Sequence, residues 1–192
     1  MFEKIFVADR EEIALRVIRT CKELGIPSVA IHSEADGNSL HIGLADEDVC
    51  IGPPPGDQSY RNYSRVLSAA EITNADAVHP GYGPLAENAE FADLCRSCGI
   101  TFIGPSVESI RTMGDKATAR ATMEAANVPV PPGTGILKDS TEARAAAAEV
   151  GYPVRLKATA GGGGRGMRIV ALEADLEHAW QVAHSEAAAA FS

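Results

Sequence analysis

The residues best suited to chemistry lie near the end of the chain, where four glycines separate two strand-like runs in the sequence PVRLKATAGGGGRGMRIV at 153–170. A Walker-type phosphate loop would need Lys and then Ser or Thr after its last glycine, followed by a helix, and a Rossmann turn also opens a helix. Here Arg165, Gly166 and Met167 follow, and then an alternating strand. We therefore expect a glycine-rich hairpin whose backbone N–H groups close over phosphate oxygens. The alternative is a mobile hairpin tip with no ligand.

The charges around this loop favour an anionic ligand. The chain carries a net charge of −9, yet no Asp or Glu occurs between Val150 and Leu172. That segment instead holds four cations, Arg155, Lys157, Arg165 and Arg168. Lys157 lies on the strand that enters the loop, so it is placed to reach the same phosphates. The acidic balance of the whole chain argues against nucleic acid as a partner, because that needs a basic face.

Two shorter segments could contribute to a binding site. In MGDKATA at 113–119, Asp115 is a candidate N-cap and Lys116 falls in the first helical turn. A cation there opposes the helix dipole at a cost of about 0.3–1 kcal/mol, whereas an anion would be attracted to the same helix end. The segment HPGYGPLAEN at 79–88 follows a predicted strand, so it lies where ligands bind in open α/β sheets. For His79 alone we favour a buried structural role.

Strand and helix patterns that alternate along the chain must position these segments. Short apolar runs predict strands at 4–8, 28–32, 47–52, 75–79 and 100–104. Helical periodicity predicts helices at 10–25, 64–74 and 87–99. This alternation indicates an α/β fold with a parallel, Rossmann-like sheet.

A second, smaller domain is predicted after residue 127. A helix at 115–127 is followed by NVPVPPGTG at 127–135, which is dense in proline and glycine. We therefore divide the chain into domains 1–127 and 128–192. The second domain should contain a short strand, a helix at 140–151, strands at 153–158 and 167–170, and a final helix from residue 175.

Composition and cysteine spacing limit the class of protein. The chain is 45% apolar and 22% charged, as in soluble globular proteins. No apolar run approaches the roughly 20 residues of a membrane span, and the first residues lack a signal-peptide pattern, so we expect a cytoplasmic protein with no membrane partner. Cys95 and Cys98 fall at the end of a predicted helix rather than its start, and no further ligands lie nearby. Ordinary thiols and no metal site are expected.

Taken in order, the segments resemble biotin carboxylase, the ATP-grasp subunit or domain of acetyl-CoA carboxylase and related biotin-dependent carboxylases. The resemblance is carried by KIFVADREEIALRVIRTCKELGI, LADEDVCIG, SAAEITNADAVHPGYGPLAEN, FIGP, MGDK and GYPVRLKATAGGGGRGMRIV. It implies that residues 1–127 form the N-terminal domain that precedes the ATP-grasp unit, and that 128–192 form a truncated flap domain. Such enzymes use MgATP and bicarbonate to carboxylate biotin on a carrier protein. The implied partners are biotin carboxyl carrier protein, a carboxyltransferase component and a second copy of the chain.

The resemblance also implies roles for particular residues. Lys116 and Lys157 match the lysines that contact the ATP phosphates, and Gly163 and Gly164 match the flap glycines that close over them. Tyr82 and Gly83 match a loop on the biotin and bicarbonate side. Three residues on one helix face match a two-fold dimer contact, although an ordinary charged helix surface would look the same: Arg16, Arg19 and Glu23.

Several residues depart from the family pattern. The segment DREEIA at 9–14 has Asp9 and Glu11 where the family has Asn and Gly, and a turn that suits glycine should be strained by Glu11. Pro84 stands where an aromatic residue is usual, and Ala160 replaces a flap glycine. Arg155 replaces an aliphatic residue and, by strand alternation, should face the same side as Lys157, where it would either reinforce phosphate binding or crowd the nucleotide.

The family's catalytic groups lie mainly in a C-terminal domain that these 192 residues do not include. The resemblance therefore implies no catalytic residue in this segment, and the segment alone is expected not to turn over. A truncated, non-catalytic module that docks on a full-length carboxylase through the Arg16, Arg19 and Glu23 face is the alternative. Another ATP-grasp ligase is a third, against which the HPGYG and MGDK runs argue.

Overall fold

A computed structural model describes residues 1–158 and 166–191 of the chain, with side chains described through Glu186. By its internal contacts the chain forms two compact units, Met1–Arg111 and Thr112–Ser192. The domain boundary expected at residue 127 stays a prediction. No helix in the described ranges is both long and apolar enough to cross a membrane.

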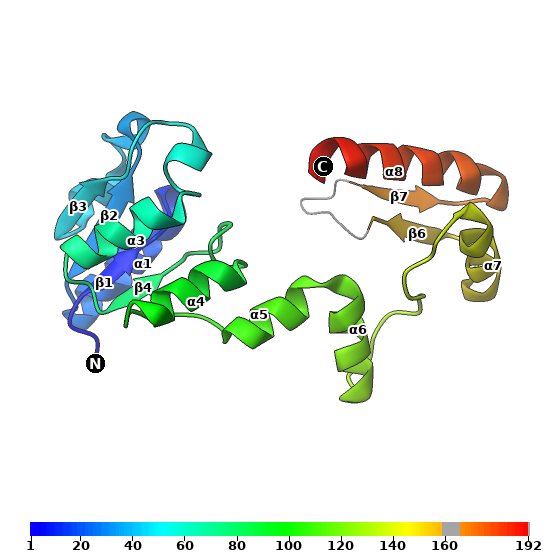
Figure 1. Ribbon diagram of the computed structural model, residues 1–192, viewed down its shortest axis with the longest axis horizontal. Helices are drawn as coiled ribbons and strands as arrows, with labels where there is room; N and C mark the ends of the chain where they lie inside the picture. Colours follow the sequence, from blue (N-terminus) through cyan, green and yellow to red (C-terminus); the bar gives the residue numbers. More distant parts are fainter. Residues whose placement is uncertain (159–165, 192) are drawn as a thin grey trace. The chain divides into compact units, whose positions relative to one another are not determined.

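The first unit is built on a parallel five-stranded sheet (Figure 1). Its strands are β1 (Ile5–Val7), β2 (Ser28–His32), β3 (Glu47–Cys50), β4 (Ala77–His79) and β5 (Thr101–Phe102). Their order is β3-β2-β1-β4-β5, and every pairing is parallel. The chain proceeds outward from β1 to β3 and then returns to the other side of β1, so the strand order reverses between β1 and β4. The parallel α/β fold expected from the sequence is confirmed.

Helices cover both faces of this sheet. Helices α1 (Glu11–Leu24) and α2 (Leu40–Leu44) pack on one face, and α3 (Tyr63–Ile72) and α4 (Ala89–Ser97) pack on the other. Alternation along β1 sends Ile5 and Val7 to the first face and Phe6 and Ala8 to the second. Phe6 and Val7 are fully buried, and each such side chain contributes about 1.5–3 kcal/mol to folding. Two layers of helices thus fix the position of β1 and of the turn that follows it.

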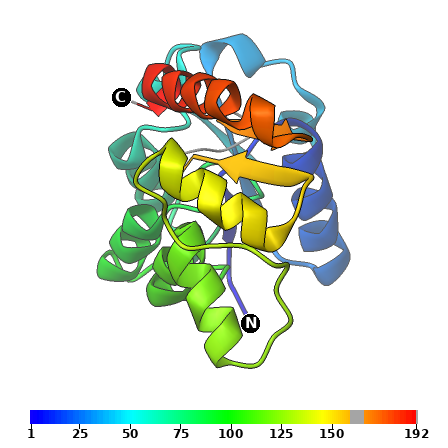
Figure 2. The ribbon, with the colours of Figure 1, turned by 90° about the vertical axis from the view of Figure 1, so that its right-hand side faces the viewer.

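The second unit places two helices against one face of a hairpin. It contains α6 (Lys116–Ala125), α7 (Ser140–Val150), α8 (Leu176–Phe191), and the antiparallel strands β6 (Val154–Lys157) and β7 (Met167–Val170). Figure 2 shows α7 and α8 beside each other along this hairpin. Their small core is formed by Ala143, Ala147, Val170 and Leu176.

Five short elements and one expected strand differ from the sequence-based prediction. The structure adds the helices α2 and α5 (Val107–Gly114) and the 3₁₀ helices Glu34–Asp36, Gly56–Gln58 and Glu173–Asp175. The short strand expected before α7 is wrong, because residues 128–139 contain turns and irregular chain only. Three prolines in this segment, Pro129, Pro131 and Pro132, lack the N–H group that a strand would donate.

Helix α1 begins without a side-chain cap, unlike α3, α4, α6 and α7. Asp115, as predicted, caps α6 by accepting the Thr118 N–H at 2.8 Å, and Asp139 caps α7. At the start of α1, however, Arg10 provides no side-chain cap, and Glu11 adopts a φ of 56°. A non-glycine residue in this left-handed region costs about 1–2 kcal/mol. The strained turn predicted from Glu11 is confirmed.

Because of this strain, glycine should be more stabilising than alanine at position 11, which is the reverse of the usual order in a helix. Glu11→Gly should unfold with a free energy about 1 kcal/mol higher than Glu11→Ala, because both variants lose the charge and only glycine is relieved of the strain. Chemical denaturation monitored by circular dichroism would measure the difference. The same pair at Glu12, inside the helix, should show the usual order with alanine more stable. If the alanine variant were the more stable one at both positions, Glu11 would not be strained.

Candidate functional site

The candidate site lies at the carboxyl ends of β1 and β4, where the strand order reverses. Ligands of open α/β sheets bind in the crevice at this point. Two segments meet here, the turn 8–12 that leads from β1 into α1 and the loop 79–84 that follows β4. The backbone N–H of Ala8 donates to the carbonyl of His79 at 2.9 Å, which continues the strand pairing up to the edge of the site.

The carboxylate of Asp9 joins the two segments. Its Oδ2 atom accepts the backbone N–H of Tyr82 at 3.2 Å and that of Gly83 at 3.1 Å. Its Oδ1 atom accepts the N–H of Arg10 at 2.9 Å. Hydrogen bonds to an ionised acceptor are about twice as strong as neutral ones. Asp9 therefore holds the expected biotin-side loop against the end of β1.

Gly81 leaves room for this carboxylate. Its φ is 64°, and a Cβ atom added there would lie 2.0 Å from Oδ2 of Asp9. On the other side, the Gly81 N–H donates to Nδ1 of His79 at 3.0 Å. Burial lowers the pKa of His79, against the raising effect of the Asp9 charge, so the ring is suited to accept this bond in its neutral form. His79 is half-buried and supports the loop.

Tyr82 is held by its hydroxyl as well as by its backbone. The hydroxyl donates to the carboxylate of Glu12, in the first turn of α1. This hydrogen bond raises the pKa of Tyr82. The side chain nevertheless remains 66% exposed. Its ring is thus held in place while a face stays open to solvent.

A polar network lies beside the site, after the end of β2. Asp36 Oδ2 accepts from the Ser33 hydroxyl at 2.6 Å and from the Tyr60 hydroxyl at 2.7 Å. The guanidinium of Arg10 lies 3.7 Å from the same oxygen and 5.2 Å from the centre of the Tyr60 ring. Burial raises the pKa of Asp36, but these hydrogen bonds and the Arg10 charge outweigh it, so the pKa is lowered overall. The network orients Arg10, which follows Asp9 directly.

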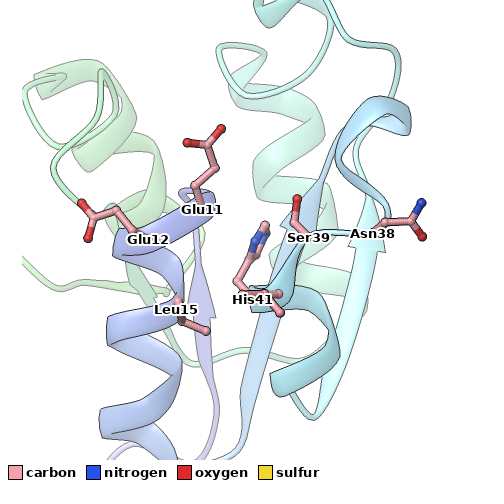
Figure 3. Close-up of a pocket in the computed structure, with 7 residues that line it drawn as sticks. Glu11, Glu12, Leu15, Asn38, Ser39 and His41 are labelled. Carbon is pink, nitrogen blue, oxygen red and sulfur yellow. The ribbon is translucent and has the colours of Figure 1, made fainter.

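A cavity of about 390 Å³ lies between the amino-terminal ends of α1 and α2 (Figure 3). Its lining consists of Glu11, Glu12, Leu15, Asn38, Ser39, Leu40 and His41. The buried His41 lies within 3.1 Å of the Ile31 carbonyl through Nε2, and its Nδ1 has no partner within the part of the chain that the structure describes. Two carboxylates on the rim make this cavity a poor place for phosphate. This cavity was not predicted from the sequence.

The expected phosphate-binding cations lie in the second unit. Arg155 and Lys157 are exposed and alternate along β6 with the half-buried Val154 and Leu156, which confirms that the two cations share one side. Arg168 belongs to the opposite side, because it pairs with Glu186 of α8. Lys116 is exposed in the first turn of α6.

Some of the remaining predicted residues lie within the part of the chain that the structure describes, and others lie outside it. Gly163, Gly164 and Ala160 lie outside the described residues. Arg16, Arg19 and Glu23 are exposed on one face of α1. The structure therefore groups Tyr82 with Gly83 in the first unit and places Lys116 and Lys157 in the second.

The contacts of Asp9 and Glu12 with the loop were not predicted from the sequence. Asp9 was expected only as a departure from the family pattern, and no role was predicted for Glu12. A signal was available, because a carboxylate directly after β1 and a glycine-rich segment after β4 must meet where the strand order reverses. Their separation of more than 70 residues hides the contact from any local pattern.

Comparison with known proteins agrees with this architecture. Residues 1–110 match the biotin carboxylase N-terminal domain, and residues 115–192 match the ATP-binding domain of the carbamoyl-phosphate synthase L chain. Biotin carboxylase 2 of Populus trichocarpa is 58% identical over 98% of this chain, and biotin carboxylase 1 of Bacillus subtilis is 50% identical over all of it.

Solved structures agree as well. A biotin carboxylase from Campylobacter jejuni, crystallised with a β,γ-ATP compound, matches the whole chain with a TM-score of 0.94 at 49% identity. The dimeric biotin carboxylase domain of 2-oxoglutarate carboxylase from Hydrogenobacter thermophilus, which contains MgADP and bicarbonate, matches with a TM-score of 0.92 at 53% identity. The chain covers 43% and 42% of these two structures, respectively.

A parallel α/β unit followed by an ATP-binding unit defines the class as ATP-grasp proteins. Within that class, the chain belongs to the biotin carboxylase family. It spans 36% of the length of the Populus relative and 43% of the Bacillus relative.

The lowered pKa of Asp36 predicts a specific dependence of stability on pH. A carboxylate whose pKa is lower in the folded state stabilises the fold above its unfolded pKa of about 3.9, and this contribution is lost as pH falls through the folded pKa. Asp36→Asn should therefore lower the free energy of unfolding at pH 7 by about 1–2 kcal/mol and reduce its loss below pH 4. Urea denaturation from pH 7 to pH 2 would measure both effects. The same substitution at the exposed Asp57 is the control, and an equal acid dependence in all three proteins would refute the role of Asp36.

Proposed function

We propose that the chain is the N-terminal part of an ATP-dependent biotin carboxylase. The whole protein would use MgATP and bicarbonate to carboxylate biotin on a biotin carboxyl carrier protein. A carboxyltransferase component would be a further partner. The observation that carries this proposal is the likeness along the entire chain, from the strand β1 to the helix α8, to proteins of that name.

The second unit would bind the nucleotide. On β6, Lys157 and Arg155 point to the side of the hairpin away from α7 and α8, and residues 150–172 contain no carboxylate. This charge distribution suits the phosphates of ATP. Lys116 would approach them at the start of α6, where the helix dipole also favours an anion. Gly163 and Gly164 would close over the same phosphates.

Magnesium would be bound mainly by the nucleotide and by residues outside this region. In the ranges 1–158 and 166–191, no three His, Cys, Asp or Glu side chains are grouped for metal binding. Mg²⁺ neutralises charge on the transferred phosphoryl group in ATP-dependent reactions. The residues of this chain would contribute lysine charges and backbone N–H groups to the same end.

The first unit would face the second substrate. The Tyr82 ring is exposed but anchored through Asp9 and Glu12, so it offers a fixed surface to the biotin or bicarbonate side of the reaction. Its carboxylate neighbours would discourage the phosphates of ATP from this position. A division of roles between the two units is therefore part of the proposal.

The charged face of α1 would form a two-fold dimer contact. Arg16, Arg19 and Glu23 are exposed and follow one another at intervals of three and four residues. Opposite charges on one self-complementary surface can pair across a two-fold axis. The same face would serve the alternative function, docking on a full-length carboxylase.

Loss of a phosphate-binding cation should weaken nucleotide binding selectively. In the complete protein, Lys157→Ala should raise the Kd for ATP about tenfold or more, because a charge-assisted contact to phosphate is lost. Isothermal titration calorimetry would measure the Kd, and Lys138→Ala, which removes an exposed cation elsewhere in the second unit, should leave it unchanged.

The proposed reaction itself is tested by ATP hydrolysis that requires both bicarbonate and biotin. Hydrolysis that is independent of biotin would refute the proposed function.

Charge reversal on α1 should disrupt the dimer. Arg19→Glu places a like charge near Glu23 on the proposed contact, so the complete protein should shift from dimer to monomer in sedimentation velocity experiments. Arg96→Glu on α4, which is also exposed but lies on the other face of the sheet, should remain dimeric. If the Arg19→Glu variant remained dimeric, the dimer contact would have to lie on another surface.

A further inference from the structure

Asp9 occupies a small anion-binding concavity made by the loop after β4. The backbone N–H groups of Tyr82 and Gly83 converge on one oxygen, Oδ2 of Asp9, at 3.2 and 3.1 Å. Successive N–H groups that converge in this way attract an anionic oxygen. The carboxylate of Asp9 supplies that oxygen from within the chain. The loop therefore takes its shape around a charged side chain from a segment more than 70 residues away.

The fit between this carboxylate and the loop is also steric. A side chain at Gly81 would place its Cβ 2.0 Å from Oδ2 of Asp9, and one at Gly83 would come within 3.1 Å. Gly81 is thus required where Asp9 lies against the backbone, whereas a Cβ at position 83 would require only a small shift of the carboxylate. The Cβ of Asp9 would also lie 2.6 Å from a Cβ added at position 81, so only removal of the whole Asp9 side chain would leave the positive φ of Gly81 as the remaining obstacle.

A second carboxylate from the same turn holds the other end of the tyrosine. Glu12 accepts from the Tyr82 hydroxyl, while Asp9 holds the Tyr82 backbone. Between these two carboxylates lies Glu11, with its φ of 56°. Strained residues of this kind concentrate at sites where geometry matters for function. The turn after β1 therefore contacts Tyr82 at two separate points.

We propose that Asp9 is a positioning residue that fixes Tyr82 and Gly83 in the orientation needed for the biotin or bicarbonate side of the reaction. The assignment of that side rests on the proposed function, whereas the effect of Asp9 on the loop does not. Asp9 acts through backbone hydrogen bonds within the first unit, whereas the proposed nucleotide-binding residues belong to the second unit. Its loss should therefore affect one substrate and spare the other.

Steady-state kinetics of the complete protein would test this selectivity. Asp9→Ala should raise the KM for biotin or bicarbonate about tenfold, the effect of losing hydrogen bonds to a charged acceptor, while the KM for ATP changes less than about twofold. Asp9→Asn keeps one acceptor oxygen for the loop, so its KM for biotin or bicarbonate should be close to that of the unmodified protein. Asp57→Ala, an exposed carboxylate elsewhere in the same unit, should match the unmodified protein. Equal changes in all KM values for Asp9→Ala would overturn the proposal in favour of a general folding role.

Hydrogen exchange separates this proposal from the proposed function. Amide exchange in a peptide that spans residues 80–85, measured by mass spectrometry, should be faster in Asp9→Ala than in the unmodified protein and near normal in Asp9→Asn. Unchanged exchange in Asp9→Ala would overturn the positioning role, even in an active enzyme. Faster exchange in a protein without biotin-dependent activity would refute the proposed function while leaving the role of Asp9 in the loop intact.

A double-mutant cycle would test the steric fit directly. Gly81→Ala should lower Tm strongly in the unmodified protein, because the new Cβ meets the carboxylate. In the Asp9→Gly background, which also removes the Asp9 Cβ that would lie 2.6 Å from the new Cβ, the same change should lower Tm less, since only the backbone strain remains. Equal Tm shifts in the two backgrounds would show that Asp9 does not lie against Gly81 and would overturn the proposal.

Discussion

The hydrogen bonds from the Tyr82 and Gly83 amides to Asp9 are the interaction on which the candidate site depends. A parallel sheet of this order brings the ends of β1 and β4 together, but it does not determine the path of the loops that follow. Asp9 adds that information, because one carboxylate oxygen selects the orientation of two consecutive peptide groups. The glycine at position 81 is the matching condition, since any side chain there would displace the carboxylate. Fold and site are therefore coupled at a single atom.

The two units differ in electrostatic character in a way that suits two different substrates. The turn after β1 places Asp9, Glu11 and Glu12 at the edge of the first sheet, close to Tyr82. In the second unit, Arg155 and Lys157 project from a hairpin strand in a segment without carboxylates. Because the chain is acidic overall, a segment that lacks acids and carries cations is better suited to phosphates than the rest of the chain. This contrast supports the proposed division of binding roles between the two units.

Much of the fold could be predicted from the sequence because its signals are local. Strands β1, β2 and β4 are apolar runs, α1 has a regular buried stripe, and the Asp115 cap and the Glu11 strain each follow from one residue type at one position. Helix α2 was missed because five residues are too few to show a period. The strand expected after residue 127 was wrong because prolines interrupt its apolar residues. The contacts of Asp9 and Glu12 with Tyr82 are long-range, so no pattern within a window could indicate them.

Asp9 and Glu11, the two residues of the turn after β1 that depart from the expected family pattern, have effects of similar size and opposite sign. A left-handed Glu11 costs about 1–2 kcal/mol that a glycine would not cost. A carboxylate at position 9 accepts charge-assisted hydrogen bonds, which contribute about 1.5–3 kcal/mol where a neutral amide would contribute about 0.5–1.5. The gain at Asp9 thus offsets much of the strain at Glu11, two residues later in the same turn. Asp9 therefore holds the loop at Tyr82 and Gly83 in spite of the neighbouring strain, which supports the proposed site geometry.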